Sequence, residues 1–211
     1  MTASPPPAAN FEVVLASSNP GKLSEIRDIL CELPLAIRPL SDFPGVILPD
    51  EGEDYEDNAI AKARAAAAFA GRVALADDSG LEVFGLGGAP GPLSARFGGP
   101  GLDDARRIDA LLRALGSLAG EQRRARFVCI AALATPDGEL VTARGECTGH
   151  ILDAPRGCSG FGYDPVFQIE GSGLAMAEIP ASEKNRISHR ARAFSALSDA
   201  IRAKFGSEHF D

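Results

Sequence analysis

The feature that most constrains the fold is a change of hydrophobic periodicity near the start of the sequence. Phe11 to Ala16 is a short apolar run rich in β-branched residues, and polar, turn-forming residues follow from Ser17 to Lys22. Leucine and isoleucine side chains then recur at helical spacing until Pro34, where a helix has to stop. A strand, a polar turn and a helix in this order indicate an α/β or α+β protein.

The rest of the chain continues to alternate strand and helix patterns. We predict further strands over residues 36–40, 72–77, 81–84, 126–134 and 139–151. We predict helices over residues 23–33, 54–70, 102–118 and 188–205. The tetrapeptide Thr135-Pro136-Asp137-Gly138 is typical of a hairpin turn between the two longest strands. This order indicates an α/β (mixed) fold, and it is compatible with an elongated domain of two lobes with a cleft between them.

Composition limits the partners of the chain. Its 21 basic and 29 acidic residues give a net charge of −8, which argues against a nucleic-acid binder because phosphate-backbone affinity needs a clustered basic face. The sequence shows neither a secretory signal nor the roughly 20 apolar residues that span a bilayer, so we expect no membrane partner. The four cysteines lack metal-binding spacing and fit the reduced thiols of a cytoplasmic protein. We expect a disordered leader over residues 1–10 and a single domain over residues 11–211.

Two segments carry groups that suit phosphate and a metal ion. The turn at residues 17–22 lies between a strand and a helix N-terminus, where backbone N–H groups favour an anion, although the Walker A pattern is missing and an ordinary capped turn explains it equally well. Asp77 and Asp78 follow an apolar strand, and because successive strand side chains point to opposite faces, only one of them is expected in a given site. Mg²⁺ is typically held by one or two carboxylates, so the acidic loop at residues 50–53 is the expected source of a second. A solvated turn is the alternative for the two aspartates.

Of two later segments, one suits a planar ring and the other suits an anionic or electron-rich ligand. Residues 161–164 join two aromatic rings, a glycine and an acid in one turn, which fits a planar ring but also fits a patch of core. Residues 184–190 place cations at the start of the last helix, where the helix dipole disfavours them. A bound anion would account for that violation, and a solvated basic cluster is the alternative.

Taken together and in this order, these segments closely resemble the non-canonical purine nucleoside triphosphate pyrophosphatases, the inosine/xanthosine triphosphate pyrophosphatase family. The resemblance covers residues 13–197 and is carried by the motifs VVLASSNPGK, EDNAIAKA, ADDSGLEV, GGAPGPLSARF, RARFVC, PRGCSGFGYDPVF and EKNRISHRARAF. It implies a homodimeric, Mg²⁺-dependent hydrolase with an elongated mixed β-sheet flanked by helices and a nucleotide cleft between two lobes. It further implies that ITP, dITP and XTP are cleaved to the monophosphate and pyrophosphate, which cleanses the nucleotide pool.

The resemblance also assigns roles to residues. Asp78 corresponds to the catalytic acid that binds metal and serves as general base. The second metal ligand is expected from the acidic loop, where Asp50 and Glu51 are the candidates and Glu53 stays open, because Asp54-Tyr55 stands where the family usually has Thr-Phe. The residues expected to bind substrate are Ser17, Ser18, Asn19, Pro20, Gly21, Lys22, Lys62, Ser79, Phe161, Gly162, Tyr163, Asp164, Lys184, His189 and Arg190.

Base choice and two rival interpretations complete the sequence-based picture. Donors from His189 and Arg190 suit the 6-keto oxygen of hypoxanthine or xanthine, whereas adenine presents an amino donor there. The Maf-like nucleotide pyrophosphatases are the first rival, but the arginine pair usual in their first turn is missing here. The second rival is a nucleotide-binding sensor without turnover, against which Asp78 and Lys22 argue.

Overall fold

The computed structural model describes residues 11–209, with side chains described as far as Arg202. The leader predicted at residues 1–10 lies outside the described residues, and so does the side chain of Phe205, which the sequence places on the apolar face of the last helix. The strands are β1 Phe11–Leu15, β2 Leu35–Pro39, β3 Ala74–Val83, β4 Pro90–Gly91, β5 Arg124–Ala134, β6 Leu140–Ile151 and β7 Phe167–Ile169. The helices are α1 Pro20–Ile29, α2 Tyr55–Ala70, α3 Asp104–Leu115, α4 Ala181–Ile187 and α5 His189–His209.

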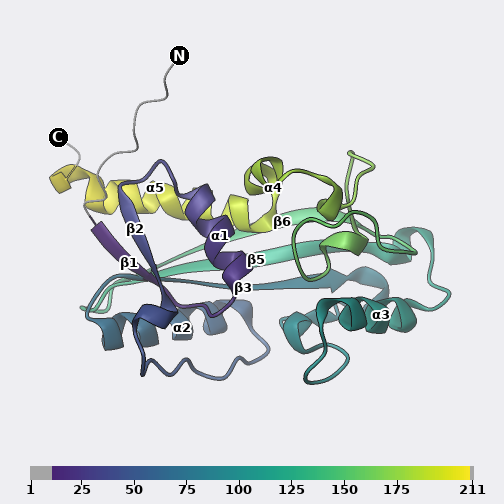
Figure 1. Cartoon of the computed structure of the whole chain (residues 1–211), viewed down its shortest axis with the longest axis horizontal. Coiled ribbons are helices and arrows are strands. Elements are labelled where there is room, and N and C mark those ends of the chain that lie inside the picture. Colours follow the sequence, from purple (N-terminus) through teal and green to yellow (C-terminus); the bar gives the residue numbers. More distant parts are fainter. Residues whose placement is uncertain (1–10, 210–211) are drawn as a thin grey trace, which may run out of the picture.

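One mixed sheet runs along the length of the molecule (Figure 1). Its strand order is β2-β1-β3-β5-β6-β7, and β4 pairs with the C-terminal end of β3. Strand β1 is parallel to β2 and β3, while the other pairs are antiparallel. The predicted hairpin is present, since β5 and β6 pair from Ala134 and Leu140 along their length. The predicted mixed α/β fold is thereby confirmed.

Helices flank the sheet and divide the molecule into two lobes. In the first lobe, α1 and α5 pack on one face through an aliphatic cluster that includes Leu15, Leu75 and Leu197. Helix α2 packs its alanines on the opposite face. In the second lobe, α3 packs on a cluster that contains the aromatic side chains of Phe127 and Phe167. Strands β3, β5 and β6 pass through both lobes. No helix among residues 11–209 is long and apolar enough to cross a membrane.

Helix α2 has the ends that the sequence predicts. Asp54 is its N-cap and accepts hydrogen bonds from the backbone N–H groups of Glu56 and Asp57. Gly71 ends it in the left-handed conformation, with φ of 60°. These caps fix where the helix begins, and therefore which of its side chains face β3.

Two predicted boundaries are wrong, and one short helix was not predicted. Helix α1 runs from Pro20 to Ile29 rather than over residues 23–33, because Asn19 caps it before the first leucine. The predicted break at residues 78–80 is absent, and β3 is one continuous strand paired with β5 throughout. Its polar side chains find buried partners instead of solvent, so they do not end the strand. The last cationic segment is divided between α4 and α5, which meet at Ser188.

Candidate active site

The site forms where strand β1 separates from strand β3. Strand β1 pairs with β3 at Ala74 and Leu75, and β4 pairs with β3 at Leu81 and Glu82. Between these points no described strand pairs with that edge of β3. Ligands of α/β proteins bind beyond the carboxyl ends of parallel strands, where the sheet order changes. Here this position leaves both faces of β3 open to one pocket.

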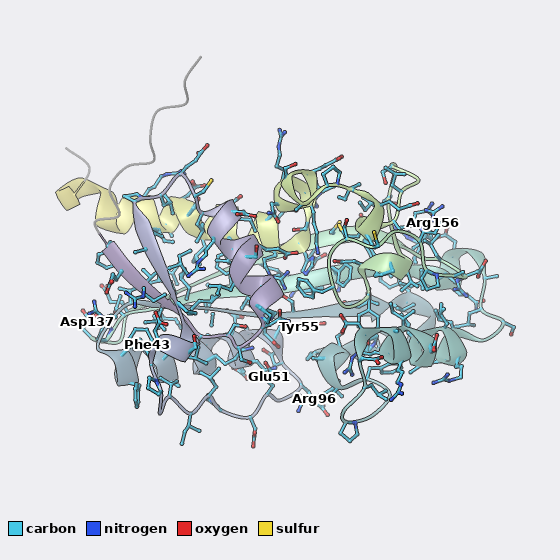
Figure 2. The ribbon with its side chains drawn as sticks, viewed as in Figure 1. Phe43, Glu51, Tyr55, Arg96, Asp137 and Arg156 are labelled. Atoms are coloured by element: carbon cyan, nitrogen blue, oxygen red, sulfur yellow. The ribbon has the colours of Figure 1, made fainter. Side chains whose placement is uncertain are left out.

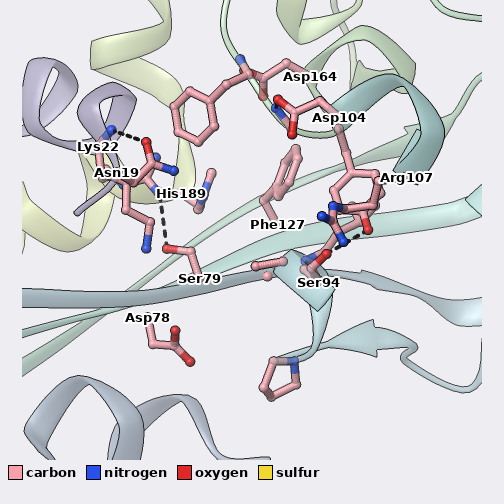
Figure 3. A pocket seen from close by; sticks show the side chains of 18 of the residues that line it. Asn19, Lys22, Asp78, Ser79, Ser94, Asp104, Arg107, Phe127, Asp164 and His189 are labelled. Carbon is pink, nitrogen blue, oxygen red and sulfur yellow. Dashed lines mark hydrogen bonds between the residues drawn. The ribbon is translucent and has the colours of Figure 1, made fainter. Parts of the chain in front are cut away.

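The pocket lies between the two lobes (Figure 3). Residues of both lobes line it, and charged side chains lie among the aromatic rings of Phe127, Phe161 and Tyr163. Its lining residues are Asn19, Lys22, Glu51, Asp78, Ser79, Gly80, Leu81, Pro92, Ser94, Ala95, Asp104, Arg107, Phe127, Phe161, Gly162, Tyr163, Asp164, Lys184, His189 and Arg190. One pocket therefore brings together residues from the polar turn at 17–22, from the aspartate pair, and from the segments 161–164 and 184–190.

The polar turn positions Lys22, and two of the backbone N–H groups that could bind an anion are already paired within the turn. The Asn19 side chain accepts hydrogen bonds from the N–H groups of Gly21 at 2.8 Å and Lys22 at 3.2 Å. A Cβ on Gly21 would lie 2.7 Å from a carbon of the Phe161 ring, so this glycine permits the close approach of the ring. The Nζ atom of Lys22 reaches Asp77 Oδ2 at 2.9 Å.

Asp77 is a buried counter-ion. Its carboxylate accepts from Ser79 Oγ at 2.8 Å and lies 3.2 Å from Nη2 of Arg190. Burial alone would raise the pKa of Asp77, but the attraction of Lys22 and Arg190 holds that pKa well below its usual range. Asp77 is therefore ionised at neutral pH and committed to two cations.

Asp78 occupies the opposite face of the same strand. Its oxygens accept from Asn58 Nδ2 at 2.8 Å and from Lys62 Nζ at 3.2 Å. Burial raises the pKa of Asp78, while Lys62 and Asn58 oppose that rise. The Nζ atom of Lys62 also lies 2.6 Å from Oε1 of Glu51, so two carboxylates from separate segments converge on one ammonium group.

The acidic loop that carries Glu51 is held from the second lobe. Figure 2 shows Glu51 and Arg96 close together, and Arg96 Nη2 donates to the carbonyl oxygen of Glu51 at 2.9 Å. Burial would raise the pKa of Glu51, but its hydrogen bond and attraction to Lys62 lower it. Asp50, in contrast, is exposed and is not among the residues that line the pocket.

The donor set fits a hard divalent cation. Asp78 and Glu51 both line the pocket. No group of three or more His, Cys, Asp and Glu side chains suited to a metal ion occurs within the described part of the chain. Mg²⁺ usually keeps several waters and binds one or two carboxylates together with substrate phosphates, so two convergent carboxylates suffice.

The aromatic end of the pocket is built from both lobes. The Phe161 ring lies over Nζ of Lys184 at 4.8 Å, measured to its centroid. The His189 ring stacks on Phe127 with centroids 4.7 Å apart. His189 is buried, and its Nδ1 atom has no hydrogen-bond partner among the described residues. Burial and the nearby cations Arg190 and Lys184 hold the pKa of His189 well below its ordinary value, so its ring is neutral at pH 7.

With this geometry in place, comparisons with known proteins identify the family. The model of the Ham1 family matches residues 13–200. This chain belongs to the Ham1 family. It is 46% identical over 192 residues to a dITP/XTP pyrophosphatase of Thermus thermophilus, covering 91% of this chain and 92% of the relative. It is also 46% identical over 190 residues to a dITP/XTP pyrophosphatase of Geobacter sulfurreducens, covering 90% and 96%.

Solved Ham1 structures have the same fold. The structure of a HAM1 protein from Coxiella burnetii matches with a TM-score of 0.83 at 40% identity, covering 92% of this chain and 99% of that one. A second match, titled nucleoside-triphosphatase / dITP/XTP pyrophosphatase and from Mycobacterium abscessus, has a TM-score of 0.72 at 42% identity and covers 89% and 98%. The family resemblance drawn from the motifs is confirmed.

Some expected substrate-binding residues of this Ham1 protein do not line the pocket. Ser17, Ser18 and Pro20 line an adjoining hollow beside residues 39–46. Lys62 reaches Asp78 from α2, behind the lining residues. Tyr163 does line the pocket, but its hydroxyl donates to the carbonyl oxygen of Ser94 at 2.9 Å and so stabilises the turn at residues 161–164.

Several pocket residues escaped the sequence-based assignment. Asp104 accepts a hydrogen bond from the N–H of Gly162 at 2.7 Å and so connects α3 to the turn at residues 161–164. Nothing local in the sequence marks this contact, because it depends on how the lobes pack. Asn58 does not line the pocket but donates to Asp78, and it could have been found because it precedes Lys62 by four residues and therefore shares its helix face.

Proposed function

We propose that this Ham1 protein is a Mg²⁺-dependent nucleoside-triphosphate diphosphatase that hydrolyses dITP, XTP and ITP to the monophosphate and pyrophosphate. The observation that carries the proposal is the pocket itself, which joins the carboxylates of Asp78 and Glu51 to the ring of Phe161 across a single cleft. The names of the relatives from Thermus and Geobacter support the same activity.

The acidic end supplies the groups that hydrolysis of a triphosphate needs. Asp78 and Glu51 would hold Mg²⁺, which when bound neutralises charge on the phosphate oxygens. Lys22 and Lys62 add positive charge near the same point. Asp78, or a water molecule that it orients, would accept the proton of the attacking water. Attack of water between the α- and β-phosphates would then release pyrophosphate and leave the monophosphate.

The aromatic end supplies base recognition. Because His189 is neutral, one ring nitrogen carries a proton, and the unpartnered Nδ1 atom is free to bond a base. A proton on Nδ1 would donate to the 6-keto oxygen of hypoxanthine or xanthine. Adenine would present an amino donor there, and two facing donors leave both unpaired in a buried site.

A pyrophosphate-release panel tests the proposal. Purified protein is assayed with dITP, ITP, XTP, GTP, ATP, dTTP and UTP, with and without Mg²⁺. We expect Mg²⁺-dependent release from the three deaminated purine nucleotides well above the other four. Equal turnover of UTP and ITP would favour the Maf-like assignment instead. Binding of ITP without turnover of any nucleotide would indicate a sensor.

The resemblance to the family also motivates two expectations about the protein as a whole. We expect a homodimer, which light scattering on the purified chain would detect. We expect a cytoplasmic location, which fractionation of the source cells would test. A monomer at working concentrations would contradict the first expectation without affecting the proposed chemistry.

A further inference from the structure

One buried acid next to the pocket has no part in the chemistry described so far. Glu25 lies on α1, one helical turn after Lys22, and is only 8% exposed. Its two oxygens bind different cations, with Oε1 2.7 Å from Nζ of Lys184 and Oε2 2.5 Å from Nη1 of Arg190. Glu25 does not itself line the pocket, whereas both of its partners do.

Glu25 is the central link of a continuous chain of ion pairs. From the phosphate turn the order is Lys22, Asp77, Arg190, Glu25, Lys184 and Asp164. Cations and acids alternate, so each buried charge in the chain has a partner of opposite sign. The chain ends at Asp164, which also accepts from the N–H of Phe161 at 2.9 Å. It therefore connects the helix that carries Lys22 to the turn that carries the aromatic ring.

The Phe161 ring rests on the two cations that Glu25 holds. Its centroid lies 4.8 Å from Nζ of Lys184 and 5.6 Å from Cζ of Arg190. Its edge meets α1 at Gly21. A cation under an aromatic face attracts it, so the places of the two cations determine the place of the ring.

We propose that Glu25 is a positioning residue for base recognition: by bridging Lys184 and Arg190, it fixes the Phe161 ring against the helix that carries Lys22. This inference rests on the proposed nucleotide function. Without the shared carboxylate, two adjacent cations lose their common partner and repel each other. The ring then loses its defined platform, while Lys22 keeps its ion pair with Asp77 and Lys62 keeps its pairs with Glu51 and Asp78.

The test separates base binding from phosphate binding. Isothermal titration calorimetry is run on wild type and Glu25→Gln with two probes, dIMP, which has the base, and inorganic tripolyphosphate, which has none. We expect affinity for dIMP to fall by about 10- to 100-fold, the size of effect that a misplaced binding group produces. Affinity for tripolyphosphate should change by less than about threefold, because Lys22 and Lys62 keep their own acidic partners in this variant. In kinetics with dITP, KM should rise more than kcat falls.

Two further variants keep the test decisive. Glu32→Gln removes an exposed carboxylate just beyond the same helix and should change neither affinity. Glu25→Asp keeps the charge with a shorter reach, so it should lose dIMP affinity to an intermediate degree, and it replaces Glu25→Gln if that variant does not fold. Equal losses for both probes, or unchanged binding of dIMP, would overturn the role of Glu25. Failure of the wild type to bind dIMP would instead overturn the proposed function on which the inference rests.

Discussion

The two faces of strand β3 put neighbouring aspartates to different uses. On one face, Asp77 is enclosed by Lys22 and Arg190, and its pKa is held well below the usual range. On the other, Asp78 meets Asn58 and Lys62, and its pKa is raised. Both acids are nearly inaccessible, so exposure does not distinguish them. The two acids differ instead in the number of cations that approach them.

The difference follows from the alternation of side chains along a strand. Consecutive residues point to opposite faces, so one acid is directed toward α1 and α5 and the other toward α2. An acid paired with two cations stabilises the fold and cannot easily accept a proton. An acid with a raised pKa can. We therefore propose a structural role for Asp77 and a chemical role for Asp78, and each can be tested separately.

The largest expected effect is on catalysis by Asp78→Asn. We expect kcat for dITP to fall by about 10²- to 10⁴-fold, the usual contribution of a general base, because the amide cannot accept the proton. The melting temperature should stay close to that of the wild type, since the amide oxygen can still accept from Asn58. Asp57→Asn, an exposed acid on α2, is the matched control and should retain activity. Activity of Asp78→Asn within threefold of the wild type would remove Asp78 from the chemistry.

The reverse pattern is expected for Asp77→Asn. Removing one member of a buried ion pair leaves an uncompensated charge, here on Lys22 and Arg190, and costs about 3–5 kcal/mol of the free energy of unfolding. Urea unfolding followed by circular dichroism measures this loss. If Asp77→Asn is as stable as Asp78→Asn, the two faces of β3 do not differ in how strongly they depend on their acid.

The Asp77 face also predicts how stability depends on pH. The folded-state pKa of His189 lies well below its ordinary value of about 6.5, so below that pH the unfolded chain binds a proton that the folded chain does not. The free energy of unfolding should therefore fall as pH decreases from 7 to 5, by at most about 1.4 kcal/mol per pH unit. His189→Gln should remove much of this slope, whereas His150→Gln should keep it. An unchanged slope in His189→Gln would refute this cause.

The sequence predicted the parts of the molecule that depend on local pattern. The capped helix α2 and the hairpin of β5 and β6 were found from periodicity and turn residues, and most residues of the pocket were found through the family resemblance. The continuity of β3 through residues 78–80 was missed, because it depends on partners more than a dozen residues away. Glu25 was missed for the same reason, since its ion-pair partners lie on α4 and α5.

The smallest expected effect concerns a hydroxyl group beside the Asp78 face. Tyr55 is buried, and its hydroxyl oxygen has no hydrogen-bond partner although it lies close to Gly80. An unsatisfied buried polar group destabilises the fold, so Tyr55→Phe should raise the free energy of unfolding by about 1 kcal/mol. Tyr163→Phe is the matched control of opposite sign, because it removes the donor to Ser94 and should lower the same quantity by about 1 kcal/mol. Equal losses in the two variants would mean that the Tyr55 hydroxyl is satisfied in solution, and that the Asp78 face is more hydrated than the face built around Asp77.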